Sequence, residues 1–208
     1  MTNVLIIDSA ATGDASVSRR LTRELGATLR GTGSVRIVHR DVGTDPIPHL
    51  TAATTPAIRG AKAETDAARA AIALSDELIA ELKAADLVVI GAPMYNFGIP
   101  STLKAWFDHV LRAGITFRYS EAGPEGLLKG KKTIVIESRA GLYSTGPSVP
   151  MDSQEPHLRT LLAFMGLDDV AFVRVEKLAF GPDLAAASIA AAIDELRSLA
   201  TEELPIAA

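Results

Sequence analysis

The sequence predicts an α/β domain in which helices cover both faces of a five-stranded parallel sheet. The chain has 208 residues, of which 48% are hydrophobic. This length is enough for one well-buried core and short for two, so we expect a single domain over residues 1–208. Short runs of consecutive apolar residues alternate with segments of helical periodicity, and this pattern is typical of parallel strands joined by crossover helices.

The predicted strands are mostly unbroken apolar runs, which indicates burial on both faces. VLII near the N-terminus and LVVI near the middle of the chain are the clearest examples. The run SVRIVH instead alternates and places Val35, Ile37 and His39 on one face. The five predicted strands span residues 4–7, 34–39, 87–90, 133–136 and 170–175.

The predicted helices carry apolar residues three or four positions apart. They span residues 16–29, 67–83, 100–113, 155–165 and 185–199. Pro100 suits the first position of the third helix, and Gly114 suits the position just after its end. Gly166 is expected to end the fourth helix in the same way.

Five strands of this kind are expected in the order 2-1-3-4-5, with a ligand bound beyond their carboxyl ends. In such sheets the ligand lies where the strand order reverses, here between the first and third strands. The loops to inspect are therefore residues 8–15, residues 92–99 and the segment after residue 137.

The first of these loops, DSAATGDASVSRRL, is rich in hydroxyl groups and lacks both G-x-G-x-x-G and the P-loop pattern. It offers Ser9, Thr12, Ser16 and Ser18 at the start of a predicted helix. Hydroxyl groups, free amides and the helix dipole favour an anion such as a phosphate monoester. The alternative is that Ser16 only caps the helix.

The second loop, PMYNFG, has the composition of a site for a flat heterocycle. Met94, Tyr95 and Phe97 supply apolar walls, while Asn96 supplies a donor and an acceptor. The alternative is a hydrophobic loop that closes the end of the core.

The third loop, ESRAGLYSTG, adds polar groups and a flexible turn. Ser138, the Ala140-Gly141 pair and Tyr143 lie in it, and Arg139 could neutralise charge on a ligand. A phosphate at the first loop and a polar heterocycle between the second and third loops together describe flavin mononucleotide (FMN).

Two long segments are predicted to be irregular, residues 43–66 and residues 114–130. Loops of this length are usually lids, subunit contacts or exposed insertions. Phe117 and Tyr119 in the second segment either line a lid or pack beneath the loop.

The second and third loops and the segment over residues 114–130 belong to longer motifs, and the combination of these motifs is more specific than any one of them. These are APMYNFGIPSTLKAWFDHVLRAGITFRY, GPEGLLKGKK and SRAG. With them, the chain resembles the FMN-dependent NADH:quinone oxidoreductases, also called FMN-dependent NADH-azoreductases. The resemblance covers essentially the whole chain, and it implies a flavodoxin-like three-layer sandwich.

The resemblance also implies which residues bind FMN. On the phosphate side they are Ser9, Ser16, Val17 and Ser18. On the isoalloxazine side they are Met94, Tyr95, Asn96, Phe97, Ser138, Arg139, Ala140 and Gly141, with Asn96 a candidate contact for the flavin edge. The chain departs from the family pattern at Ala10, often Ser, and at Ala140, often Gly.

The activity implied by the resemblance is a ping-pong reaction. Hydride comes from NADH or NADPH, a choice that the sequence leaves open. The acceptors are quinones, which are reduced by two electrons, and aromatic azo compounds, which are cleaved to amines. One FMN per subunit, and a homodimer with its sites at the interface, are also implied, with residues 43–66 a candidate to reach the partner. The rival hypotheses are a flavodoxin-type electron carrier and a non-catalytic FMN-binding module.

Composition argues against other classes of function. The net charge of −4, without a basic stripe, argues against nucleic acid and anionic membranes as partners. The chain has no cysteine, and its four histidines lack metal-ligand spacing, so we expect no metal site. No G-x-S-x-G motif supports Ser9 as a hydrolase nucleophile. No apolar run is long enough for a signal peptide or membrane span, so we expect a cytoplasmic protein.

Overall fold

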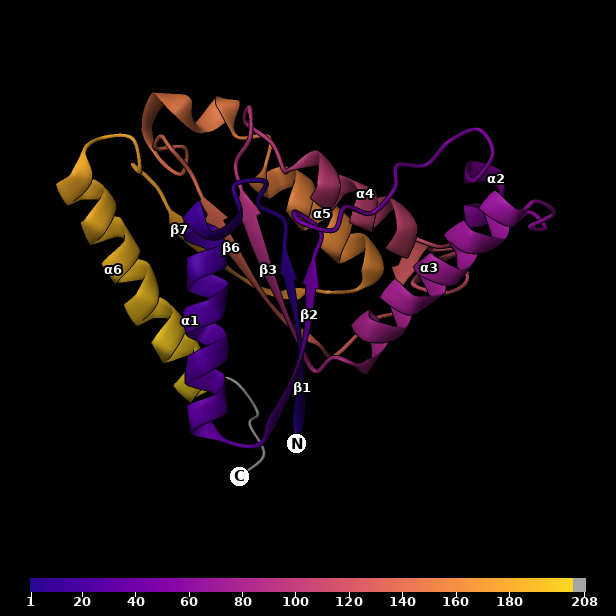
Figure 1. The fold of residues 1–208 in the computed structure, drawn as a ribbon, viewed down its shortest axis with the longest axis horizontal. Helices are drawn as coiled ribbons and strands as arrows, with labels where there is room; N and C mark the ends of the chain where they lie inside the picture. Colours follow the sequence, from indigo (N-terminus) through magenta and orange to yellow (C-terminus); the bar gives the residue numbers. More distant parts are fainter. Residues whose placement is uncertain (204–208) are drawn as a thin grey trace.

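A five-stranded parallel sheet forms the centre of the computed structural model, which describes residues 1–203 (Figure 1). Its strands are β1 (Thr2–Asp8), β2 (Val35–Asp41), β3 (Leu87–Pro93), β6 (Lys132–Ser138) and β7 (Asp169–Val175). Their order is β2-β1-β3-β6-β7, and each neighbouring pair is parallel. Numbered along this sheet alone, the order is 2-1-3-4-5, so the predicted topology is confirmed.

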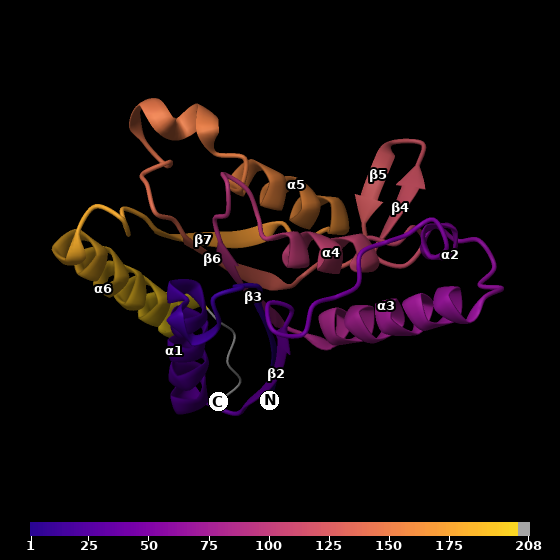
Figure 2. The ribbon, with the colours of Figure 1, turned by 45° about the horizontal axis from the view of Figure 1, so that its top comes forward.

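Helices cover the sheet on both sides and make three layers (Figures 1 and 2). The long helices are α1 (Val17–Thr32), α3 (Asp66–Ala84), α4 (Ser101–Val110), α5 (Glu155–Met165) and α6 (Pro182–Ser198). Helices α1 and α6 pack on one face, and α3, α4 and α5 pack on the other. Among residues 1–203, no helix has the length and apolar character that crossing a membrane requires.

The apolar runs of the sequence are explained by this double coverage. In β1, Leu5 and Ile7 face the α3–α5 side, whereas Val4 and Ile6 face the side of α1 and α6. Complete burial of such a side chain contributes about 1.5–3 kcal/mol. Strands that are covered on both faces therefore gain from an apolar residue at every position.

Helix ends follow the predicted residues at α5 but not at α4. Gly166 ends α5 in the left-handed conformation, with φ 87°, as predicted. Helix α4 begins at Ser101 and ends at Val110. Pro100 therefore precedes the helix and is not its first residue, and Gly114 lies several residues beyond its end, which corrects both predictions. The early end has a physical cause, because the Thr116 hydroxyl donates to the Val110 carbonyl at 2.6 Å and satisfies it.

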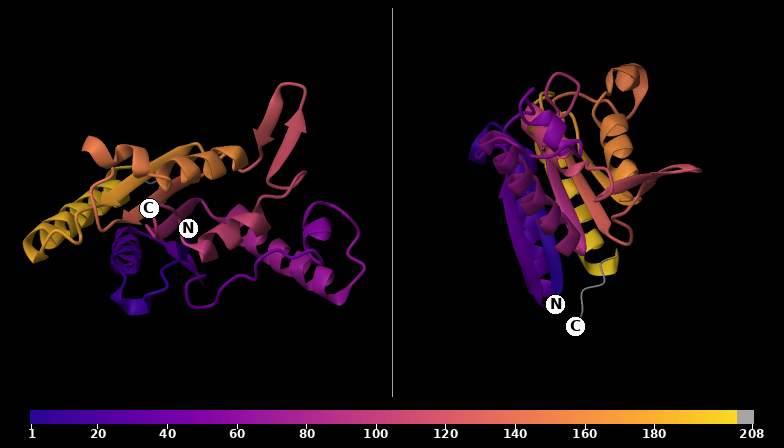
Figure 3. Two further views of the ribbon diagram at one scale, coloured as in Figure 1. Left: turned by 90° about the horizontal axis from the view of Figure 1, so that it is seen from above. Right: turned by 90° about the vertical axis from the view of Figure 1, so that its right-hand side faces the viewer.

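The segment predicted as irregular over residues 114–130 contains a β-hairpin, which corrects that prediction. Strands β4 (Phe117–Ser120) and β5 (Gly123–Gly126) pair in antiparallel fashion and project from the body of the molecule (Figure 3). Phe117 is buried against Phe164, with ring centroids 4.6 Å apart, while Tyr119 is 72% exposed. Of the two alternatives for this pair, packing beneath the loop therefore describes Phe117.

The segment over residues 43–66 is mostly irregular, with one short helix, α2 (Thr55–Ile58). It is tied to the core through His109, whose Nε2 lies 3.0 Å from the Pro48 carbonyl. The remaining short helices are η1 (Gly13–Ala15), η2 (Gly146–Met151) and η3 (Leu199–Glu203).

Candidate functional site

Three loops meet at the carboxyl ends of β1, β3 and β6, where the strand order reverses. The amide of Ala11 in the first loop donates to the Tyr95 hydroxyl in the second, at 3.1 Å. The Met94 amide then donates to the Ser138 carbonyl at 2.9 Å, which joins the second loop to the third. The structure thus brings together three loops that are far apart in the sequence.

The first loop gathers buried hydroxyl groups around a helix start. Ser16 and Ser18 are buried, and their Oγ atoms lie 3.1 Å apart. Ser16 Oγ accepts from the Arg19 amide at 3.3 Å, so the capping role proposed as an alternative is present. The amides of Val17 and Ser18 have no hydrogen-bond partner within residues 1–203. Cap and anion site are therefore compatible at this turn.

Ser9 lies in the same loop but uses its hydroxyl elsewhere. Its Oγ donates to the Gly91 carbonyl at 2.7 Å, and the residue is 1% exposed. The single hydroxyl proton of Ser9 is thus committed to β3, so its side chain links the first loop to the sheet.

The second loop is a tight turn in an unusual conformation. Tyr95 and Gly98 exchange backbone hydrogen bonds of 2.9 and 3.1 Å. Between them, Asn96 has φ 48° and Phe97 has φ 69°. Asn tolerates this region, but a bulky aromatic residue rarely occupies it, and such strain is concentrated at functional sites. Phe97 is also 41% exposed, so it does not plug the core, which was the alternative for this loop.

The third loop presents three consecutive free amides. The carbonyls of Arg139, Ala140 and Gly141 accept hydrogen bonds from the backbone of residues 177–179. In the described part of the chain, the amides of Ala140, Gly141 and Leu142 have no partner. Ala140 is exposed and has no positive φ, so its methyl group replaces the usual Gly without strain. The turn is thus built to donate hydrogen bonds.

Arg139 does not act as predicted from its place in the third loop. Its side chain is fully buried and pairs with Glu137 at 2.6 Å, Asp152 at 3.1 Å and Glu176 at 3.3 Å. A guanidinium group held in this way faces the core, so the prediction that it neutralises a ligand's charge is wrong. The residue is 0% exposed as a whole, and its backbone anchors the loop by donating to the Val175 carbonyl at 2.8 Å.

Comparison with known proteins agrees with this arrangement. A family model described as the flavodoxin-like fold matches residues 2–200. A protein of Hyphomonas neptunium named FMN-dependent NADH:quinone oxidoreductase is 52% identical over 209 residues, covering 100% of both chains. The chain belongs to the FMN-dependent NADH:quinone oxidoreductase family. A relative from Ralstonia nicotianae with the same name is 48% identical and covers 91% of this chain and 92% of its own.

Solved structures related to this family are similar over nearly the whole chain. The FMN-dependent NADH-azoreductase from Bacillus anthracis in complex with FMN has a TM-score of 0.86 at 25% identity. An azoreductase from the same organism has a TM-score of 0.85 at 28% identity. Both comparisons cover 97% of this chain and 100% of the other.

Two polar residues that support the loops of the candidate site were missed from the sequence. Gln154 donates to the Ala92 carbonyl at 2.8 Å and accepts from Arg139 Nε at 3.0 Å. Glu176 accepts from the amides of Tyr143 and Ser144 at 2.8 and 2.9 Å. Glu176 directly follows the last predicted strand, so its position at a strand's carboxyl end was the available indication. Gln154 gave no comparable indication.

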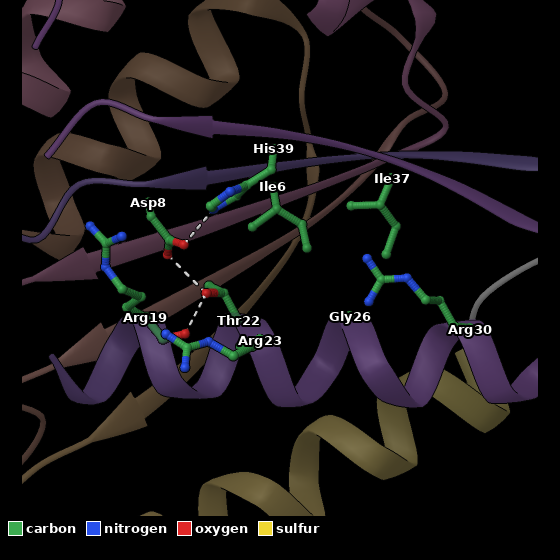
Figure 4. A pocket seen from close by; sticks show the side chains of 9 residues that line it. All are labelled: Ile6, Asp8, Arg19, Thr22, Arg23, Gly26, Arg30, Ile37 and His39. Atoms are coloured by element: carbon green, nitrogen blue, oxygen red, sulfur yellow. Dashed lines mark hydrogen bonds and ion pairs between the residues drawn. The ribbon is translucent and has the colours of Figure 1, made fainter. Parts of the chain in front are cut away.

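A cavity of about 250 Å³ lies behind the first loop, between α1 and the edge strand β2 (Figure 4). Inside it, the buried carboxylate of Asp8 contacts His39 Nε2 at 2.7 Å and the Thr22 hydroxyl at 2.8 Å. Arg19, which also lines the cavity, is paired with Asp41. Because Asp8 directly precedes Ser9, this cluster supports the first loop from behind. Within residues 1–203, no group of His, Asp or Glu is arranged to hold a metal ion.

The contact between His39 and Asp8 predicts a pH-dependent stability. The hydrogen bond with Asp8 raises the pKa of His39, and burial opposes this only in part. A raised pKa in the folded state stabilises the protein below the unfolded pKa of about 6.5, and this stabilisation is lost as pH rises through the folded pKa. We expect His39→Gln to lower the melting temperature near about pH 6 and to have little effect above about pH 8.

Melting curves of both proteins across this pH range check the prediction. His49→Gln is the matched control, because the side chain of His49 forms no hydrogen bond with residues 1–203. An effect of His39→Gln that is equal at every pH would contradict the role of the charged imidazole.

Proposed function

We propose that this protein is an FMN-dependent oxidoreductase that transfers electrons from NADH to quinones and aromatic azo compounds. Relatives that are 48–52% identical carry the name FMN-dependent NADH:quinone oxidoreductase. The observation that carries the proposal is the set of free amides and hydroxyl groups on three loops that meet at the switch point of the sheet. We also propose that residues 1–208 act as one domain.

The first loop fits the phosphate of FMN. The amides of Val17 and Ser18 are free to donate, and the hydroxyl groups of Ser16 and Ser18 lie beside them. The positive end of α1 favours the same anion. Ser9 supports this loop through its hydrogen bond to Gly91 and does not donate from its side chain.

The second and third loops fit the isoalloxazine ring. The amides of Ala140 and Gly141 can donate to a heterocycle's carbonyl edge, on which reduction places negative charge. Asn96 is exposed and its side-chain amide has no partner among residues 1–203. Met94, Tyr95 and Phe97 give the apolar surface, while the backbone of Ser138 and Arg139 holds the turn in place.

The cofactor is proposed to carry the redox chemistry, and the protein is proposed to bind and orient it. FMN, when bound, supplies the capacity to accept a hydride and to pass on two electrons. The chain's part is to hold the phosphate, to orient the ring edge and to leave one side of the ring open to a flat substrate. Phe97 and Tyr143 are the aromatic side chains at that opening.

An absorption spectrum tests this function. The purified protein is mixed with FMN, freed of excess, and scanned before and after anaerobic addition of NADH. We expect retained flavin bands that bleach with NADH and return when a quinone is added. A protein that retains no flavin would overturn the proposal, and retained flavin that NADH does not bleach would favour a non-catalytic FMN-binding module.

We propose further that the protein is a cytoplasmic homodimer, with residues 43–66 reaching the partner subunit. These residues are mostly irregular, and long irregular loops in a compact domain are usually functional. Light scattering should give a mass near twice 21.9 kDa. A monomeric mass would remove the proposed subunit contact.

A further inference from the structure

The side chain of Glu176 accepts four hydrogen bonds at the third loop. Its side chain is only 9% exposed. One carboxylate oxygen accepts from the amides of Tyr143 and Ser144 at 2.8 and 2.9 Å. The other oxygen accepts from the Ser144 hydroxyl. Glu176 thus satisfies both backbone donors of residues 143–144, which have no other partner in the described chain.

The neighbouring part of the loop is held by different contacts. The carbonyls of residues 139–141 accept hydrogen bonds from the backbone amides of residues 177–179, at 2.8 to 3.3 Å. These bonds run from backbone to backbone and do not involve the Glu176 side chain. Residues 140–142, which present the free amides, and residues 143–144 therefore have separate anchors.

Residues 143–144 place an aromatic side chain at the opening of the site. The Tyr143 ring packs edge-on against Phe97, with centroids 6.1 Å apart and planes at 80°. It also covers Gly141, where an added Cβ atom would lie 2.9 Å from the Tyr143 ring. Tyr143 and Phe97 thereby bridge the second and third loops.

We propose that Glu176 is a positioning residue that holds Tyr143 against Phe97 and so shapes the site for the electron acceptor. This inference rests on the proposed function. A flat acceptor over the flavin meets this aromatic pair, and aromatic surfaces bind such molecules best when they are held in place beforehand. The phosphate loop and the free amides of residues 140–142, which are proposed to hold FMN, are anchored without the Glu176 side chain. Replacing Glu176 should therefore change the KM for the acceptor and not the affinity for FMN.

The structure also indicates that Glu176 can be replaced without loss of the fold. Arg139, its buried cationic neighbour, keeps Glu137 and Asp152 as partners when Glu176 is absent. Glu176→Ala removes the three hydrogen bonds that residues 143–144 donate to its carboxylate. Glu176→Gln retains an oxygen that can accept from both amides, so it is the conservative variant.

The first measurement uses the apoprotein and needs no activity. Hydrogen–deuterium exchange is followed in a peptide that covers residues 140–146. We expect exchange at residues 143 and 144 to be at least about tenfold faster in Glu176→Ala, and close to wild type in Glu176→Gln. Glu24→Gln, an exposed carboxylate on α1 without a hydrogen-bond partner in residues 1–203, is the charge-matched control.

The second measurement separates the acceptor from the cofactor. In Glu176→Ala we expect the KM for a quinone to rise about tenfold, because two freed residues must be ordered on binding. The kcat and the dissociation constant of FMN should change by less than about threefold, since the contacts that would hold FMN are intact. Glu176→Gln should restore most of the KM.

Each outcome decides the inference. Unchanged exchange or an unchanged quinone KM in Glu176→Ala would overturn it. FMN affinity that falls in parallel with the KM would also overturn it, because Glu176 would then hold the entire loop. A wild-type protein that fails to bind FMN or to oxidise NADH would instead refute the proposed function, and the inference with it. Measurements on wild type alone therefore separate failure of the proposed function from failure of the inference about Glu176.

Discussion

Ser16→Asp is expected to keep α1 capped while it reduces the affinity for FMN by more than about a hundredfold. Asp is as good an N-cap as Ser, so the hydrogen bond to the Arg19 amide can be preserved. The new carboxylate lies beside Ser18, where the phosphate is proposed to bind. Two like charges about 4 Å apart repel by about 4 kcal/mol at an effective dielectric constant of 20. Fluorescence titration with FMN measures the affinity, and thermal melting of the apoprotein measures the cap.

Ser16→Ala and riboflavin complete this experiment. Ser16→Ala should destabilise the apoprotein by about 1 kcal/mol through loss of the cap. Its affinity for FMN should fall only about tenfold, because one hydrogen bond is lost without any repulsion. Riboflavin lacks the phosphate, so its binding should not distinguish Ser16→Asp from wild type. If Ser16→Asp binds FMN as well as wild type does, then Ser16 is a cap and nothing more.

Arg139→Met is expected to destabilise the protein by about 3–5 kcal/mol. The guanidinium group is fully buried and, among residues 1–203, is the only cation in an ion pair with Glu137, whose Oε1 already lacks a partner there. Methionine fills similar space but leaves the buried carboxyl group of Glu137 without its partner. Urea denaturation measures the loss. Arg197→Met is the control, because its ion pair with Asp194 is exposed and is expected to contribute less than about 1 kcal/mol.

The destabilisation should grow as pH rises above about 8. Burial raises the pKa of Glu137 to about 8, although Arg139 opposes this. Without Arg139 that opposition is lost and the pKa rises further. In both proteins the folded state retains a proton that the unfolded state releases above about pH 4.5, so stability falls with increasing pH. In wild type this fall ends near pH 8, whereas in Arg139→Met it continues to higher pH, so the two proteins diverge there. Glu137→Gln combined with Arg139→Met should recover stability and flatten this dependence. A double variant as unstable as Arg139→Met would show that another carboxylate is responsible.

Much of the fold was predictable because its cause is local. The run of Val4 to Ile7 is apolar at every position, since the strand is covered on both faces. Gly166 predicted the end of α5 because only a residue that tolerates positive φ fits there. Helix α4 was predicted too long, because its end depends on Thr116, a side chain six residues beyond Val110.

The candidate site was predictable in position but not in the direction of its side chains. The three loops could be chosen from the predicted strand order. In an open parallel sheet, a ligand binds beyond the carboxyl ends of the strands, at the point where that order reverses. Arg139 was expected to face a ligand, yet it is buried among carboxylates that come from β6, from the residue after β7 and from the start of α5. No local pattern reveals such a pairing, because its partners are up to 37 residues away.

By itself, the sequence determined the alternation of strands and helices, the strand order and the loops that form the site. Periodicity and turn residues act over a few positions, so they can be recognised along the chain. Only the tertiary structure decided the roles of individual polar residues. Ser9 is committed to Gly91, Arg139 to the core and Glu176 to the loop at Tyr143. A buried polar group must find a partner, and which partner it finds depends on segments that meet only when the sheet is assembled.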